Sequence, residues 1–249
     1  MRVIVAAFKF AFFAVATFGL YPIWWVGNLI LPNKVYWRQV LFGWWANSFR
    51  IASRMKVQII GTPPKAPFFL VTNHLSYADI PAIRVAVPSI FVAKGEIEQW
   101  ALIGRIVKDM AGTIFIDRSN RRDIPRAGEL IMERLNGGEG VVIFPEGTST
   151  KGENVIPFHS SFFEFAVEEG VPVSYGSITY QTPPGELEAN VAVCWWDETT
   201  FFAHMWRLFK VKGFTAIITF GDAPVAGTDR KELAKELRQL VETNFVPVL

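Results

Sequence analysis

The stretch at residues 68–79 decides the fold class, and it reads Phe-Phe-Leu-Val-Thr-Asn-His-Leu-Ser-Tyr-Ala-Asp. Its first five residues are apolar or β-branched and predict a buried strand. The polar residues that follow predict a loop, and the apolar positions at 80–87 predict a helix. A strand that passes through a polar loop into a helix is typical of layered α/β domains.

The same alternation of short apolar runs and turn residues continues from residue 56 to the end of the chain. Strands are expected at 56–60, 68–72, 90–93, 113–116, 140–144, 171–178, 190–195 and 216–220. Helices are expected at 80–87, 125–135, 162–169 and 231–245, the last with Asp229 as its N-cap. We therefore predict an α/β domain at 56–249, with a layered, mixed or mostly parallel sheet flanked by helices.

The first 78 residues are basic and aromatic. They contain eight Lys or Arg, no acidic residue and five of the nine tryptophans. Residues 10–31 are uncharged, and as a helix they would be about as long as the hydrocarbon core of a bilayer is thick. Pro22 and the tryptophans after it indicate an interfacial bend, so a full span and an interfacial anchor are both open. A cleaved signal peptide and a buried core helix are competing interpretations, but Lys9 argues against the first and the missing acids against the second.

Residues 34–55 have apolar side chains on one helical face and basic side chains on the other. This pattern predicts an amphipathic helix that lies on anionic lipid, although the same helix could pack on the body of the protein. A turn is expected between the two helices, at Pro32 and Asn33. We expect 1–55 to form a membrane-associated helical hairpin at the cytoplasmic face of the inner (plasma) membrane, because positive charge flanks its apolar segments.

Composition excludes several classes of protein. A chain of 249 residues with 51% hydrophobic residues is long and apolar enough to fold around a substantial core, so it is not a disordered segment. Cys194 is the single cysteine, and no Cys/His cluster has the spacing of a zinc site, so we expect no metal. No nucleic-acid partner is expected, because the basic third is too apolar for a stacking surface. The chain contains no Gly-x-Ser-x-Gly sequence, which argues against a serine hydrolase.

His74 and Asp79 follow the expected strand at 68–72, where side chains would face a cleft. On one continuous helix they would lie about 140° apart and could not pair. If His74 lies in the loop and Asp79 at the start of the helix, the carboxylate can hold one ring nitrogen and leave the other as a general base. The alternative is that Asp79 only caps the helix and that His74 is an ordinary loop histidine.

A second polar loop follows the expected strand at 140–144 and contains Glu146, Gly147 and Thr148. Its backbone N–H groups can face an anion or a developing oxyanion, although the same residues also make a plain turn. Arg118 follows a third strand, and its guanidinium suits a phosphate. Simple exposure to solvent explains that arginine equally well.

These residues, taken in order, resemble the four sequence blocks of the glycerolipid acyltransferase family. The blocks are Asn73-His74 with Asp79, Phe115 with Arg118, Phe144-Pro145-Glu146-Gly147-Thr148, and Val171-Pro172-Val173. The resemblance spans residues 56–220 and includes Lys94 between the first two blocks. It implies an enzyme of the 1-acylglycerol-3-phosphate acyltransferase type, which moves a fatty acyl group directly from acyl-CoA or acyl carrier protein to a lysolipid hydroxyl. It implies no cofactor beyond that thioester co-substrate.

The resemblance also implies roles for individual residues. His74 would be the general base, and Asp79 would orient its ring and stabilise the imidazolium. Binding of the substrates would fall to a set of polar residues, namely Asn73, Lys94, Arg118, Glu146, Gly147 and Thr148.

Ser149 departs from the family pattern. Many phosphatidate-forming members have arginine there, and its guanidinium fork suits a phosphomonoester. We expect lysophosphatidate as the acceptor, with lyso-ornithine lipid or a lysophospholipid with a larger head group as the alternative. A non-catalytic membrane lipid-binding protein is the second alternative, and it would be favoured by loss of His74 or Asp79, both of which are present.

Overall fold

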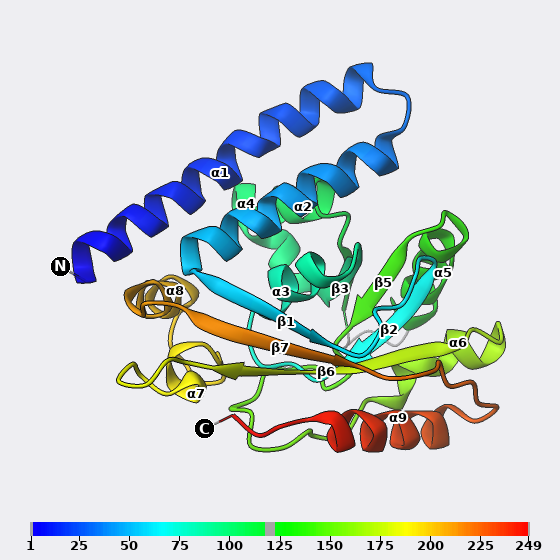
Figure 1. Ribbon diagram of the computed structural model, residues 1–249. Coiled ribbons are helices and arrows are strands. Elements are labelled where there is room, and N and C mark those ends of the chain that lie inside the picture. Colours follow the sequence, from blue (N-terminus) through cyan, green and yellow to red (C-terminus); the bar gives the residue numbers. More distant parts are fainter. Residues whose placement is uncertain (1, 118–122, 249) are drawn as a thin grey trace.

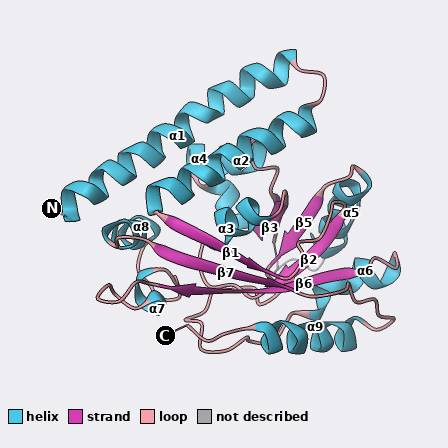
Figure 2. Ribbon diagram, in the orientation of Figure 1, coloured by secondary structure: helices cyan, strands magenta, loops and turns pink. Residues whose placement is uncertain are grey.

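The computed structural model describes residues 2–117 and 123–248, which form a helical hairpin on a layered α/β body (Figures 1 and 2). Seven strands make one sheet in the order β1-β7-β6-β2-β5-β3-β4. The strands are β1 (Met55–Ile60), β2 (Phe68–Thr72), β3 (Ile90–Lys94), β4 (Ile114–Ile116), β5 (Gly140–Ile143), β6 (Val173–Gln181) and β7 (Phe214–Phe220). The predicted α/β fold class is confirmed.

The sheet is mixed, and its parallel part carries the polar loops. Strands β6, β2, β5, β3 and β4 run parallel, whereas β7 is antiparallel to β6 and parallel to β1. All residues of β2 and β5 are buried, as expected for central parallel strands covered on both faces. Since β2, β5 and β3 are parallel, the loops that follow them lie at one edge of the sheet.

Helices cover both faces of the sheet. In Figure 1 the hairpin, α3 and α4 lie on one side, and α6 and α9 lie on the other. The helices are α1 (Arg2–Ile30), α2 (Lys34–Ser53), α3 (Asp79–Ala86), η1 (Gly95–Gln99), α4 (Ala101–Asp109), α5 (Asp123–Asn136), η2 (Ser160–Phe163), α6 (Glu164–Glu168), α7 (Ala189–Ala192), α8 (Phe201–Lys210) and α9 (Arg230–Asn244). As predicted, Asp229 caps α9, and its side chain accepts hydrogen bonds from the N–H groups of Lys231 and Glu232.

The hairpin consists of α1 and α2, and the Asn33 side chain caps α2 by accepting from the Tyr36 N–H. Helix α1 continues through Pro22 without a break, and the predicted interfacial bend stays a prediction. Of the described helices, α1 is long and apolar enough to cross a membrane, and 17% of its most apolar window is buried. Large apolar side chains along its outer face are exposed, among them Phe8 and Ile30.

The hairpin shares the core of the body. The Phe13 ring on α1 lies 5.3 Å from that of Phe49 on α2 and 6.3 Å from that of Phe209 on α8. Arg38 on α2 is buried, and it donates to both carboxylate oxygens of the buried Glu139, which immediately precedes β5. A domain boundary between residues 55 and 56 stays a prediction, and β1 begins at Met55.

Three segments differ from the sequence-based expectation, namely residues 190–195 and helices α4 and α8. The predicted strand at 190–195 is wrong, because this run holds the end of the short helix α7 and a turn in which the indole N–H of Trp195 donates to the Thr199 carbonyl. A short apolar run does not distinguish a strand from a buried helical turn. Helices α4 and α8 were not predicted, although both are strongly amphipathic.

Candidate active site

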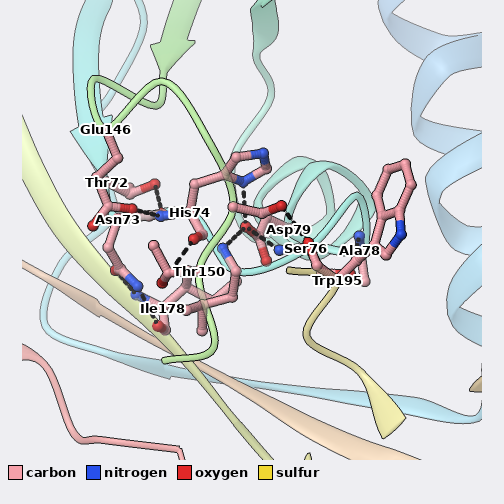
Figure 3. A network of polar contacts seen from close by, with 12 residues as sticks. Thr72, Asn73, His74, Ser76, Ala78, Asp79, Glu146, Thr150, Ile178 and Trp195 are labelled. Atoms are coloured by element: carbon pink, nitrogen blue, oxygen red, sulfur yellow. Dashed lines mark hydrogen bonds and ion pairs between the residues drawn. The ribbon is translucent and has the colours of Figure 1, made fainter. Parts of the chain in front are cut away.

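The loop between β2 and α3 brings His74 and Asp79 together, as expected. Nδ1 of His74 lies 2.7 Å from Oδ2 of Asp79, and the second ring nitrogen points away from that carboxylate (Figure 3). Asp79 is the first residue of α3 and is fully buried, whereas the His74 side chain is 21% exposed. Because the carboxylate accepts at Nδ1, the ring carries its proton there and presents Nε2 as the available base.

Asp79 also shapes the loop that presents His74. Its Oδ2 accepts from the N–H groups of Leu75 at 2.7 Å and Ser76 at 3.1 Å. Its Oδ1 accepts from the hydroxyl of Tyr180, on β6, at 2.6 Å. The carboxylate therefore does more than cap a helix, since it fixes the histidine ring and the backbone beside it.

Asn73 joins this loop to β6. Its amide Nδ2 donates to the carbonyl of Ile178 at 2.9 Å, and its Oδ1 accepts from the N–H of Ile178 at 2.8 Å (Figure 3). The Asn73 side chain is buried, with 1% of the residue exposed. Its two hydrogen bonds extend the contact between β2 and β6 beyond Thr72, the last paired residue of β2. This arrangement holds the backbone next to His74 rather than presenting the amide to solvent.

Glu146 holds the same backbone from the opposite side. One carboxylate oxygen accepts from the N–H of His74 at 2.6 Å and the other from the N–H of Ile156 at 2.9 Å. Burial is the dominant cause that raises the pKa of Glu146 to about 8, against the opposing effect of those two hydrogen bonds. Phe144, two residues earlier, stacks on the His74 ring with 4.1 Å between centroids.

Ser149 and Thr150 fasten the second polar loop to its neighbours. The Ser149 hydroxyl donates to the Trp195 carbonyl, and the Thr150 N–H donates to the His74 carbonyl at 3.0 Å. The Trp195 N–H donates to the Leu75 carbonyl at 2.8 Å. These hydrogen bonds connect three loops around His74. In the loop after β5, Thr148 is exposed, and Gly147 has a positive φ of 76° that favours glycine.

Comparison with known proteins identifies the family. A family model described as Acyltransferase matches residues 50–174. The chain is 34% identical over 205 residues to the lyso-ornithine lipid O-acyltransferase of Pseudomonas aeruginosa, an alignment that covers 82% of this chain and 78% of that protein. The chain belongs to this acyltransferase family.

Two further comparisons agree with that assignment. The acyltransferase is 31% identical over 164 residues to the 1-acyl-sn-glycerol-3-phosphate acyltransferase of Neisseria gonorrhoeae, covering 65% of this chain and 63% of that protein. Its fold matches the crystal structure of the 1-acyl-sn-glycerophosphate acyltransferase PlsC from Thermotoga maritima with a TM-score of 0.73. That match covers 98% of this chain and 95% of the other at 19% identity, so it supports the fold alone.

An apolar cavity lies beside the loop of the acyltransferase that carries His74. Its volume is about 280 Å³, and its walls come from α1, α2, α3, β3, α4 and α8. Tyr77 and Ile80 connect it to the His74–Asp79 segment, and Phe10 and Phe13 of the hairpin line its side formed by α1. Sequence reasoning did not find this cavity, because its lining comes from segments far apart in the chain.

The remaining predicted residues occupy different places. Lys94 ends β3 at the same edge of the sheet and is exposed. Arg118 lies outside the described residues. Within residues 2–117 and 123–248 no cluster of three or more His, Cys, Asp or Glu could hold a metal ion.

His204 belongs to the site although the motifs did not reveal its role. It is fully buried on α8, and burial lowers its pKa to about 4, so the ring is neutral. Its Nε2–H donates to the Cys194 carbonyl at 2.9 Å, which leaves Nδ1 to accept from the Tyr77 hydroxyl at 3.0 Å. Tyr77 lies between His74 and Asp79 in sequence, so α8 supports the same loop.

Proposed function

We propose that this acyltransferase transfers a fatty acyl group from an acyl thioester to the free hydroxyl of a membrane lysolipid, with His74 as general base and Asp79 as its partner. The hydrogen bond between His74 Nδ1 and Asp79 carries the proposal, because it leaves Nε2 directed away from the carboxylate. Relatives named for acylation of lyso-ornithine lipid and of 1-acylglycerol-3-phosphate support the substrate class.

The proposed reaction is a direct acyl transfer. Nε2 of His74 takes the proton of the acceptor hydroxyl as that oxygen bonds to the thioester carbonyl carbon. The tetrahedral intermediate then collapses, the carbon–sulfur bond breaks, and the imidazolium returns its proton to the leaving thiolate. Asp79 stabilises the imidazolium between these steps. The products are an ester and a thiol, so the reaction requires no cofactor beyond acyl-CoA or acyl carrier protein.

The acyl chain is assigned to the apolar cavity. Phenyl and indole rings dominate its lining, and its wall includes Tyr77, three residues from His74. Because part of the wall belongs to α1 and α2, a chain leaving the bilayer would stay in an apolar environment on its way to the catalytic loop. Membrane association through α1 follows from the same arrangement, and we place the enzyme at the cytoplasmic face, where acyl thioesters are made.

Polar residues around His74 divide into two groups in this proposal. Asn73 and Glu146 act through the backbone, because hydrogen bonds with Ile178, His74 and Ile156 use both polar atoms of each side chain. Substrate contact is assigned to the polar groups that end or follow strands β3, β4 and β5 in the sequence. These are Lys94, Arg118, Gly147 and Thr148.

We propose lyso-ornithine lipid as the acceptor ahead of lysophosphatidate, which was the expectation from the sequence alone. The family resemblance places an arginine at position 149 in many phosphatidate-forming members, whereas this chain has Ser149, whose hydroxyl donates to the Trp195 carbonyl. The alignment with the lyso-ornithine lipid enzyme is also longer than that with the 1-acylglycerol-3-phosphate enzyme, 205 against 164 residues. Lysophosphatidate is the second candidate, and Lys94 with Arg118 supplies the charge that a phosphate would require.

The proposal is tested with purified enzyme in lipid micelles. One labelled acyl thioester is offered with lyso-ornithine lipid, lysophosphatidate and lysophosphatidylethanolamine in parallel. His74→Ala should lower turnover by at least a thousandfold while vesicle binding is unchanged, and His159→Ala, which removes an exposed imidazole, should remain active. Near-normal turnover of His74→Ala would refute the assignment of the base. No His74-dependent transfer to any acceptor would instead support a lipid-binding protein.

A further inference from the structure

Tyr180 is a buried tyrosine whose hydroxyl contacts the carboxylate partner of the proposed base. It lies near the end of β6, 1% exposed, more than 100 residues from Asp79 in the chain. Its hydroxyl donates to Oδ1 of Asp79 at 2.6 Å. No sequence block predicts this contact.

The two oxygens of Asp79 have different partners. Oδ2 accepts from the His74 ring and from the N–H groups of Leu75 and Ser76. Oδ1 accepts from Tyr180, the side chain that reaches it from the opposite side. Without that hydroxyl, Oδ1 would be a buried acceptor lacking this donor. Oδ2 would stay beside His74 through the Leu75 and Ser76 N–H groups, but the angle at which it meets Nδ1 would no longer be fixed.

Strand β6 therefore supports the catalytic loop at two neighbouring positions. The backbone of Ile178 holds the Asn73 amide, and two residues further the Tyr180 side chain holds Asp79. The Ile178 contact is made by backbone groups in the plane of the sheet, whereas the Tyr180 contact is made by a side chain that stands out from it, so β6 holds the loop in two directions. One rigid strand in the middle of the sheet thus fixes both ends of the segment that carries His74.

We propose that Tyr180 is a positioning residue of the acyl-transfer centre, whose hydroxyl holds Oδ1 of Asp79 so that Oδ2 stays turned toward Nδ1 of His74. The inference rests on the proposed function of the His74–Asp79 pair and adds a third member to it. Tyr180 does not exchange protons with substrate, since it is buried behind Asp79. Burial, the largest cause, and the nearby carboxylate keep the pKa of this phenol well above its ordinary value, so it remains a donor.

Removal of this donor has a defined consequence for pH dependence. With one hydrogen bond fewer, the carboxylate keeps more negative charge and stabilises the imidazolium of His74 more strongly. The His74 ring then stays protonated up to a higher pH, and the acid limb of the pH–rate profile moves up with it. Other titratable groups close to Asp79 or Tyr180 are Glu146, Cys194 and Tyr77. The substitution at position 180 removes none of these groups, so they are present in both the variant and the wild-type enzyme.

The test is Tyr180→Phe, compared with Tyr175→Phe as a matched control. Tyr175 lies on the same strand, five residues earlier, and packs over Gly221. We expect Tyr180→Phe to lower kcat about tenfold and to change the KM for the acyl thioester and the KM for the lysolipid less than threefold. The acid limb of the plot of kcat/KM against pH should move up by about half a pH unit. Tyr175→Phe should reproduce the wild-type profile.

A double-mutant cycle separates positioning from a general effect on folding. In an Asp79→Asn background, Tyr180→Phe should change the rate less than twofold, because the hydroxyl acts through Asp79. An unchanged kcat, an unmoved acid limb, or full additivity with Asp79→Asn would each overturn the proposal. If Tyr180→Phe does not fold, 3-fluorotyrosine at position 180 keeps the hydroxyl as a stronger donor and should move the limb down, and an unmoved limb again overturns the proposal. Turnover by His74→Ala would refute the base itself, whatever the result at Tyr180.

Discussion

Replacement of Asn73 by alanine separates the two roles this residue has been given. The geometry indicates a structural role, in which the Asn73 amide holds the backbone of Ile178. Asn73→Ala then leaves both the N–H and the C=O of Ile178 without their partners. Both groups are inside the protein, and each unsatisfied buried group costs about 1–3 kcal/mol. We therefore expect the free energy of unfolding to fall by about 2–6 kcal/mol. For a chain of this size, at about 2–4 °C per kcal/mol, that corresponds to a decrease in Tm of about 4–24 °C.

The assay is urea unfolding in detergent micelles, followed by tryptophan fluorescence and repeated by thermal melting. Asn154→Ala is the matched control, because Asn154 is exposed. The control should lie within about 0.5 kcal/mol of wild type. A substrate-binding role predicts a different result, namely an Asn73→Ala protein of wild-type stability with a raised KM for the acceptor. That outcome would refute the structural role of Asn73.

Three further predictions concern charge, specificity and chain length. Glu146 titrates at a pKa of about 8 when folded and at about 4.5 in the unfolded chain, so its contribution to stability is complete below pH 4.5 and is lost as the pH rises through 8. Glu146→Gln cannot ionise, so between pH 5 and 7 its free energy of unfolding should fall by about 2–3 kcal/mol less than that of wild type, and parallel curves in urea titrations would contradict this. Ser149→Arg should raise kcat/KM for lysophosphatidate at least tenfold relative to lyso-ornithine lipid, measured in the acceptor competition assay, because a guanidinium binds a phosphomonoester in a bidentate way; an unchanged ratio would remove Ser149 as a specificity determinant. Ala93→Phe fills part of the apolar cavity and should lower kcat/KM for long-chain thioesters relative to short ones at least tenfold, whereas an equal loss for all chain lengths would place the acyl chain elsewhere.

The layered fold and the pairing of His74 with Asp79 were accessible from sequence because both depend on local order. A five-residue apolar run followed by a polar loop predicts a strand exit, and only a loop conformation lets a histidine and an aspartate five residues apart meet. The roles of Glu146 and Tyr180 were not accessible. Their partners, the His74 backbone and the Asp79 carboxylate, are 72 and 101 residues away, and pairing at that range leaves no periodic pattern in the sequence.

The same limit explains the error at 190–195. Apolar residues there were assigned to a strand, although in the structure the Trp195 backbone serves as a support for two loops. Main-chain hydrogen bonds of this kind can be made by almost any residue, so they leave no recognisable side-chain motif in the sequence. Sequence reasoning therefore found the pair proposed to carry the chemistry and missed most of the residues that hold this pair in place.

The buried contact between Arg38 and Glu139 makes the membrane anchor inseparable from the enzyme. A truncated chain that begins after the hairpin would take the Arg38 guanidinium from Glu139 and leave it, among the described residues, only the longer contact with Arg134, at 3.7 Å. It would also open the apolar cavity on the side lined by Phe10 and Phe13. Loss of one partner of a buried ion pair costs about 3–5 kcal/mol. Solubilising this enzyme by deleting its anchor would consequently remove a wall of its binding site, so water-soluble versions are better sought by exchanging outward-facing residues of α1, such as Phe8 and Ile30, for polar ones.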